Sequence, residues 1–126
     1  MATQEIPRDQ WPSFFEMFTQ QHEGWLASLE VFASDIGAQE EARDLPLEGI
    51  STTSKDDKPQ AIAISLGKSA ADHITHTIAD PTRLWLEQTP QRANAALEIE
   101  SGDKVKTLLR FRSPLPAEMV DGAVVQ

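Results

Sequence analysis

Two histidines in the middle of the chain, His73 and His76, have the spacing of a metal-binding pair. On a helix, side chains three residues apart lie on one face, so that both imidazoles could bind the same ion. The β-branched residues around them favour a strand instead, on which His76 shares a face with Ile74 and Ile78 while His73 points the other way. We therefore expect a partly buried, structural His76, with a metal site as the alternative.

The metal alternative requires further ligands, and Asp72 and His22 are the candidates. Such a site would make the chain a metal-binding protein or a metal-dependent hydrolase, and it predicts that zinc raises the melting temperature. His22 also follows an apolar helical segment, where bonding to the last helical carbonyls is its more ordinary role. Apart from this alternative we expect no cofactor.

Other patterns that resemble catalytic motifs have simpler structural explanations. Residues 67–69 (GKS) resemble the end of a phosphate loop, but the glycine required upstream is replaced by Ile62. Glu98 and Glu100 alternate outward on a strand and are expected to be solvated. The chain has no cysteine, and no serine, threonine or lysine stands in a recognisable nucleophile setting. The sequence therefore favours a protein that is not an enzyme, and we assign no catalytic residue.

A charged, irregular stretch at residues 38–51 is the second candidate site. Pro46 and Gly49 interrupt it, which predicts an edge strand with a bulge or bend. Charge on an irregular segment is also where binding sites occur. The candidate interaction residues are Glu41, Arg43, Asp44 and Glu48.

The elements that must position these residues change at Gly24. Before it, Trp11, Phe14, Phe15 and Phe18 recur at helical spacing, which predicts an amphipathic helix over residues 9–23 that ends at this glycine. After it, apolar residues alternate with period two, which predicts strands near residues 25–32, 62–66, 73–78, 84–89, 97–100 and 105–111. Residues 1–8 are expected to be a polar lead-in and residues 52–59 an exposed loop.

This order of elements predicts an α+β fold. We expect one domain over residues 1–126, with a β-rich core at 25–113, a tail at 114–126 and the helix packed on a curved, mostly antiparallel sheet. The sheet should have about five to seven strands, and closure into a small SH3-like or Sm-like barrel would remove its edges. A three-residue loop within the turn at 101–104 would place Glu100 opposite Lys106, and a register shifted by one residue is the alternative.

The overall charge narrows the class of partner. The 126 residues include 20 acidic and 11 basic side chains, for a net charge of −9. A field of this sign repels nucleic acids and anionic membranes, so neither is an expected partner. No apolar run reaches the roughly 18 residues of a membrane span, and the N-terminus does not have the pattern of a signal peptide. We therefore expect a cytoplasmic protein.

Several stretches, in order along the chain, resemble a bacterial family known as domain of unknown function 5335. They are residues 5–8, 11–12, 22–25, 29–31, 41–50 (EARDLPLEGI), 72–76 (DHITH), 80–83, 96–101 and 108–114 (LLRFRSP). The resemblance implies a single bacterial domain, and it brings no activity, cofactor or catalytic residue. The leading hypothesis is a non-enzymatic module for protein interaction or self-association, acting through the 40–50 segment or an open sheet edge. The metal hypothesis is the alternative, and the third is a small-ligand binder whose aromatic helix lines a barrel mouth beside Trp11 or Trp25.

Overall fold

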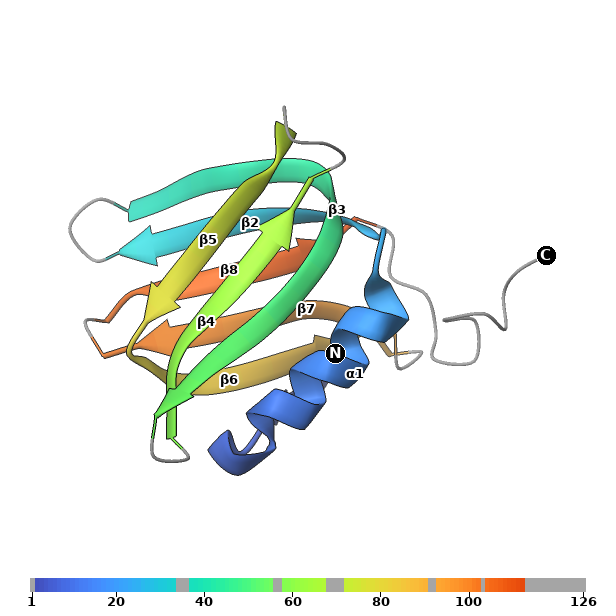
Figure 1. Ribbon diagram of the computed structural model, residues 1–126. Helices are drawn as coiled ribbons and strands as arrows, with labels where there is room; N and C mark the ends of the chain where they lie inside the picture. Colours follow the sequence, from blue (N-terminus) through green and yellow to red (C-terminus); the bar gives the residue numbers. More distant parts are fainter. Residues whose placement is uncertain are drawn as a thin grey trace.

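A long bent strand, β3 (Gly37–Lys55), joins two layers of antiparallel strands in the computed structural model (Figure 1). The structure describes residues 2–33, 37–55, 58–67, 72–90, 93–102 and 104–112. Up to Pro46, β3 pairs with β2 (Leu26–Ala33), and from Leu47 onward it pairs with β4 (Lys58–Leu66). One strand therefore belongs to both layers.

The strand order is β1-β6-β7-β8-β2-β3-β4-β5, and all neighbours are antiparallel. We call β4, β5 and residues 47–55 of β3 the front layer, and the other strands with residues 37–46 of β3 the back layer (Figure 1). The sheet has two ends, β1 and β5, and is not closed. The remaining strands are β1 (Ala2–Glu5), β5 (Ile74–Ala79), β6 (Pro81–Gln88), β7 (Asn94–Ser101) and β8 (Lys106–Phe111).

Three β-bulges allow β3 to bend. Residue Glu41 is an extra residue between the Leu29–Ala42 and Glu30–Glu40 pairs, and Arg43 and Asp44 together stand opposite Ser28. Glu48 is extra between the pairs that Leu47 and Gly49 make with β4. Each bulge increases the local twist and can turn a side chain in a new direction. Together they carry the strand from one layer to the other.

The helix α1 (Trp11–His22) closes one side of the space between the layers, after a short 3-10 turn, η1 (Arg8–Gln10) (Figure 1). Pro12 lies in its first turn, where no intrahelical N–H is needed. Trp11 is fully buried and its indole N–H donates to the carbonyl of Ile6 at 2.9 Å. After the helix, Gly24 has a φ of 89°, as expected for a glycine that ends a helix.

The core between the layers is aliphatic toward the sheet and aromatic toward the helix. Alternating residues of β4, Ile62, Ile64 and Leu66, are fully buried. The largest fully buried side chains are Trp11, Phe15, Phe18, Leu29, Leu47, Ile62, Ile64, Leu66, Leu84, Leu97, Ile99 and Leu109. The period-two patterns thus identify the inward faces of the strands.

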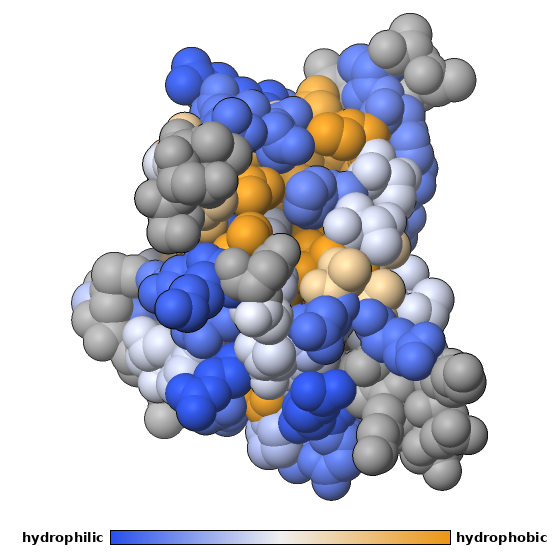
Figure 2. All heavy atoms as spheres, turned by 90° about the vertical axis from the view of Figure 1, so that its left-hand side faces the viewer, coloured by the Kyte–Doolittle hydropathy of each residue, from blue (hydrophilic) through white to orange (hydrophobic). Residues whose placement is uncertain are grey.

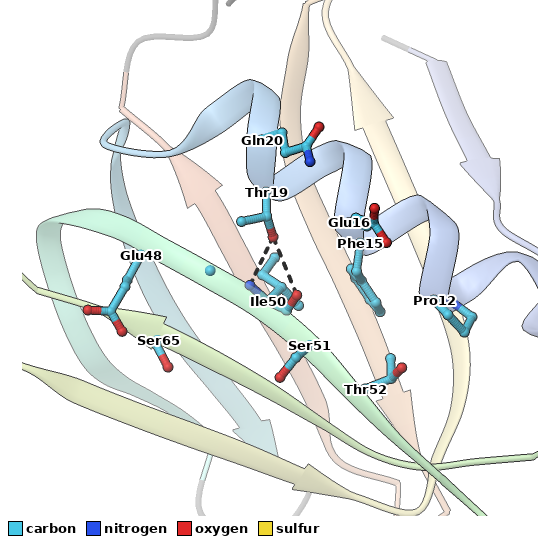
Figure 3. A pocket seen from close by; sticks show the side chains of 11 residues that line it. Pro12, Phe15, Glu16, Thr19, Gln20, Glu48, Ile50, Ser51, Thr52 and Ser65 are labelled. Carbon is cyan, nitrogen blue, oxygen red and sulfur yellow. Dashed lines mark hydrogen bonds between the residues drawn. The ribbon is translucent and has the colours of Figure 1, made fainter.

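The helix also covers the free backbone edge of β3 in the front layer. The hydroxyl of Thr19 donates to the carbonyl of Ile50 at 3.3 Å and accepts from its N–H at 3.0 Å (Figure 3). A single side chain therefore takes the place of a neighbouring strand. Covering an edge with a helix is one way in which proteins prevent unwanted strand pairing.

Removing this contact should destabilise the protein. We expect Thr19→Val to lower the free energy of unfolding by about 1–3 kcal/mol, because both backbone groups of Ile50 lose their partner at a part-buried position. Thr19→Ser keeps the hydroxyl and should retain most of the stability. Urea unfolding of the three proteins measures the difference, and equal midpoints for Thr19→Val and the parent would contradict the expectation.

Several expectations from the sequence are corrected by this architecture. The sheet has eight strands rather than five to seven, partly because residues of the predicted lead-in form β1, and it does not close into a barrel. The segment 38–51 does not end the sheet, because β3 stands between β2 and β4 in the strand order. Each half of it nevertheless pairs on one side only, and it carries the predicted bulges. Pro46 is tolerated there because it lies where β3 changes partner, and its carbonyl accepts from Gly67 N–H at 2.9 Å.

The predicted loop at 52–59 is instead largely strand, since β3 runs to Lys55 and β4 begins at Lys58. The predicted pairing of Glu100 with Lys106 is confirmed. The predicted strand around His73 is β5, which begins one residue later, at Ile74. The predicted tail at 114–126 lies outside the described residues.

Candidate functional site

The edge strand β5 ends the sheet and has a neighbouring strand on one side only. Its six residues, ITHTIA, include no formally charged side chain and no proline, and β5 pairs with β4 without a register shift. In an antiparallel ladder, alternate backbone groups point away from the existing neighbour. Proteins usually protect such an edge with lysine, proline, a bulge or a covering element. Over residues 74–79, β5 has none of the first three.

The other edges that the structure describes differ from β5. The opposite end of the sheet, β1, has only four residues and includes Glu5. The free side of β3 in the front layer is covered by α1 through Thr19. In the back layer, residues 37–46 of β3 also pair on one side only, but this stretch has two bulges and four charged side chains. In Figure 1, β5 lies at the side of the front layer away from α1, and the ends of β2 and β3 extend past it on the left. A strand placed beside β5 would therefore lie over the back layer.

Two histidine–carboxylate pairs connect β5 and the residue just before it with β3. His73 Nε2 lies 2.9 Å from Glu48 Oε1, and His76 Nδ1 lies 4.0 Å from Glu41 Oε1. Both glutamates are bulge residues of β3. The bulges thus bring carboxylates of the predicted interaction segment to the two histidines of the predicted metal pair.

The other two residues of the predicted interaction segment have different partners. Arg43 Nε lies 3.1 Å from Glu40 Oε2, and Asp44 Oδ2 lies 3.8 Å from Arg112 Nη1. Asp44 has a φ of 52° and its N–H donates to Ser28 Oγ at 3.1 Å. These are exposed or half-exposed ion pairs around a bulge, of the kind that contributes little to stability. The structure therefore places Glu41 and Glu48 beside β5, and Arg43 and Asp44 elsewhere.

A pocket of about 260 Å³ opens between β5 and the back layer. It is lined by the consecutive residues His76–Ala79, by Val31 of β2, by Ser101 of β7, and by Val105 and Thr107. Consecutive strand residues point to opposite faces, so a pocket that touches four of them meets the backbone edge of β5. Figure 2 views this side of the molecule and shows a hollow band of hydrophobic residues with hydrophilic residues on both sides.

The four predicted metal ligands do not form one cluster. His22 is fully buried against the aromatic core, His73 and His76 face different glutamates, and Asp72 is exposed. Within the described ranges, no group of three or more His, Cys, Asp or Glu residues is placed to hold a metal ion. The metal hypothesis stays a prediction that no arrangement in these ranges supports.

His22 belongs to a buried polar chain. Its Nδ1–H donates to the Phe18 carbonyl at 2.8 Å, which leaves Nε2 to accept from the Asn94 amide at 3.4 Å. Asn94 Oδ1 in turn accepts from Gln88 Nε2 at 2.9 Å. The imidazole ring is stacked on Phe111 at 5.0 Å between centroids. Burial lowers the pKa of His22 below its ordinary value of 6.5, although the bond to Phe18 raises it in part.

This lowered pKa predicts how stability depends on pH. The unfolded chain binds a proton at His22 near pH 6.5, whereas the folded protein binds it only at lower pH, so unfolding takes up protons. We expect the free energy of unfolding contributed by this group to be fully present above pH 6.5 and to be lost as the pH falls. Urea unfolding between pH 5 and 8 measures the slope. His22→Gln should reduce it, and equal slopes in the parent and in His22→Gln would contradict the assignment.

The aromatic helix does not line an open mouth at Trp11, which is fully buried in the core. A larger pocket of about 560 Å³ lies instead between α1 and the outer side of the front layer (Figure 3). Phe15, Glu16 and Thr19 line it from the helix, and Ser51 and Ser65 from the strands. The small-ligand hypothesis stays a prediction.

Two residues with notable contacts in the structure, Thr107 and Thr19, were not identified from the sequence. Thr107 is 1% exposed, and its hydroxyl has no hydrogen-bond partner in the described structure. Thr19 replaces a strand neighbour. The sequence does contain one indication for Thr107, which is a polar residue among the apolar inward-facing positions of its strand. The edge contact of Thr19 has no local sequence signal.

Comparison with known proteins identifies the family. Residues 2–120 match a family of unknown function, DUF5335. The chain belongs to this family. This DUF5335 protein is also similar to a protein of Aquifex aeolicus (strain VF5) that is described as an uncharacterized protein. The two are 28% identical over 116 residues, which cover 92% of this chain and 97% of the relative. No solved structure matches the chain significantly. In the described part of this DUF5335 protein, no helix is long and apolar enough to cross a membrane.

Proposed function

We propose that this protein is a non-enzymatic interaction module that binds an extended segment of a partner protein as an additional strand on β5. The observation that carries the proposal is the unprotected edge of residues 74–79. The other described edges are short at β1, covered by α1 in the front layer, or bulged and charged at residues 37–46 of β3. Addition of a strand gives affinity through main-chain hydrogen bonds and specificity through the pockets that alternate side chains enter.

The shape beside β5 favours a single extended segment over a second copy of this chain. The ends of β2 and β3 extend past β5, so an incoming strand would have the back layer beneath it (Figure 1). A whole second sandwich placed edge to edge would meet these ends. The inward side chains of a single added strand would cover the hydrophobic band of Figure 2.

The charge around β5 favours a neutral to basic segment. Glu48 and Glu41 lie beside the histidines at the first half of β5, and the chain carries a net charge of −9. A basic residue of the partner near these carboxylates would be attracted and an acidic one repelled. The same argument keeps nucleic acids and anionic membranes as unexpected partners, and we retain the cytoplasm as the expected location.

A displayed library of random seven-residue peptides tests the proposal directly. Selection on the immobilised protein should yield peptides with alternating apolar residues and net positive charge. Addition of such a peptide should slow amide hydrogen exchange at β5, because new hydrogen bonds form there. Failure to retain any peptide, or retention without a change in exchange at residues 74–79, would overturn the proposal.

Matched lysine variants separate edge pairing from general electrostatics. We expect Thr75→Lys, on the exposed side of β5, to weaken peptide binding about tenfold, which is ~1.4 kcal/mol. Thr53→Lys adds the same charge to the exposed side of β3, away from the edge, and should change binding less than twofold. Equal effects of the two variants would contradict strand addition. A stable dimer that buries β5 would assign the edge to self-association instead.

A further inference from the structure

One residue that lines the pocket beside β5 has a buried polar atom without a partner. Thr107 is 1% exposed and lies on the inward side of β8, opposite Val31 of β2 and Ile99 of β7. Its Oγ1 has no hydrogen-bond partner within the described structure. A buried hydroxyl without a partner costs free energy, and native proteins rarely retain one without a reason. Thr107 also lines the pocket that opens at β5.

The rest of the pocket determines which chemical group fits. Val31, Ile78 and Val105 give it aliphatic walls, and Ser101 adds one further hydroxyl. His76 is the only titratable residue among those that line it, and it faces Glu41. The described lining therefore offers no charged partner for an ionic group. The hydroxyl of Thr107 can both donate and accept, so it suits an uncharged polar group on a short aliphatic side chain.

We infer that this pocket is the anchor site for one inward-facing side chain of the bound segment, an aliphatic side chain that carries an uncharged hydroxyl or amide. This inference rests on the proposed function, since strand addition on β5 is what delivers the side chain. The pocket touches residues 76–79 along their backbone edge, and alternate residues of an added strand point inward at this position. The anchor places its polar group at Thr107 and its aliphatic part between Val31 and Val105.

Two capped amino acids of nearly equal shape test the anchor without requiring a peptide. N-acetyl-threonine N-methylamide and N-acetyl-valine N-methylamide differ by a hydroxyl in place of a methyl group. In NMR titrations of the whole protein, both should shift signals of Val31, Val105 and Thr107. The threonine compound should bind about five- to tenfold more tightly, because it supplies the missing hydrogen bond. Equal affinities, or shifts confined to other parts of the protein, would overturn the inference.

The matched variants are Thr107→Val and Thr107→Ser. Thr107→Val preserves the shape and removes the unpaired hydroxyl, so it should melt at the same or a higher temperature than the parent while losing the preference for the threonine compound. Thr107→Ser should retain the preference. A preference that persists in Thr107→Val would overturn the role of the hydroxyl.

The same measurements distinguish this inference from the proposed function. Thr75 does not line the pocket, so Thr75→Lys should weaken peptide binding and leave binding of the capped amino acids unchanged. Peptide binding that depends on Thr75 but not on the group at residue 107 would support strand addition and overturn the anchor. Binding of the capped threonine without any peptide binding would support the pocket and overturn strand addition.

Discussion

Replacing Phe18 by alanine is expected to lower the free energy of unfolding by about 3–5 kcal/mol. Phe18 is 1% exposed, and its ring centroid lies 4.2 Å from that of His22 and 5.7 Å from that of Phe111. The substitution removes one of the two helix rings, the other being His22, that contact Phe111 of β8, and it leaves a cavity between helix and sheet. Because small domains have a total stability of about 5–15 kcal/mol, much of the margin would be lost.

The neighbouring Met17 provides the control. It lies on the same helix and is 50% exposed, so Met17→Ala should change the free energy of unfolding by less than about 0.5 kcal/mol. Chemical unfolding followed by tryptophan fluorescence gives both values. The melting temperature of Phe18→Ala should fall by roughly 10–20 °C. A loss below about 1 kcal/mol would show that the aromatic contact between α1 and β8 is not part of the folded core.

Replacing Gly67 by alanine is expected to have the second large effect, about 3 kcal/mol or more. Gly67 follows β4 with a φ of 142°, a conformation that side chains rarely adopt. A Cβ at this position would lie 2.7 Å from the Asp72 carbonyl oxygen and 2.7 Å from His73 Cα. These are backbone atoms, so the strain can be relieved only by moving the start of β5. We therefore expect Gly67→Ala to weaken peptide binding as well as stability.

Gly37→Ala is the control that separates the cost of an unfavourable backbone conformation from the cost of a steric clash. Gly37 has a φ of 74°, and a Cβ there would meet nothing within 4 Å. Only the conformational cost of about 1–2 kcal/mol should appear. Thermal unfolding of the two variants, with peptide binding measured alongside, checks the contrast. If Gly67→Ala were no more destabilising than Gly37→Ala, the close approach between the two chain segments would be wrong.

The sequence predicted the helices and strands in which apolar residues recur with the helical or the strand period. Phe15 and Phe18 mark the helix, Ile62 and Ile64 mark β4, and the short turn before Lys106 determines its pairing with Glu100. In each case the deciding interactions are local, within a few residues along the chain. The family resemblance, identified from short stretches in order, is confirmed as DUF5335.

The residues around β5 could not be predicted because their placement depends on distant parts of the chain. In the sequence, Glu41 and Glu48 belong to a charged stretch that is expected to be solvated. Only the bulges of β3 bring them to His76 and His73. Pro46 suggested an edge, since proline lacks a ladder donor. The edge lies instead at β5, whose β-branched residues gave no indication that one side would remain unpaired.

The sharing of β3 between the layers has a consequence for how the protein unfolds. If either layer unfolds, β3 loses one of its two neighbours, β2 or β4. The half of β3 that is still paired then belongs to an incomplete sheet. We expect the described elements to come apart together, as one calorimetric transition whose van't Hoff and measured enthalpies agree. The edge strand β5, held on one side only, would then be the place where exchange with solvent begins while everything around it is still intact.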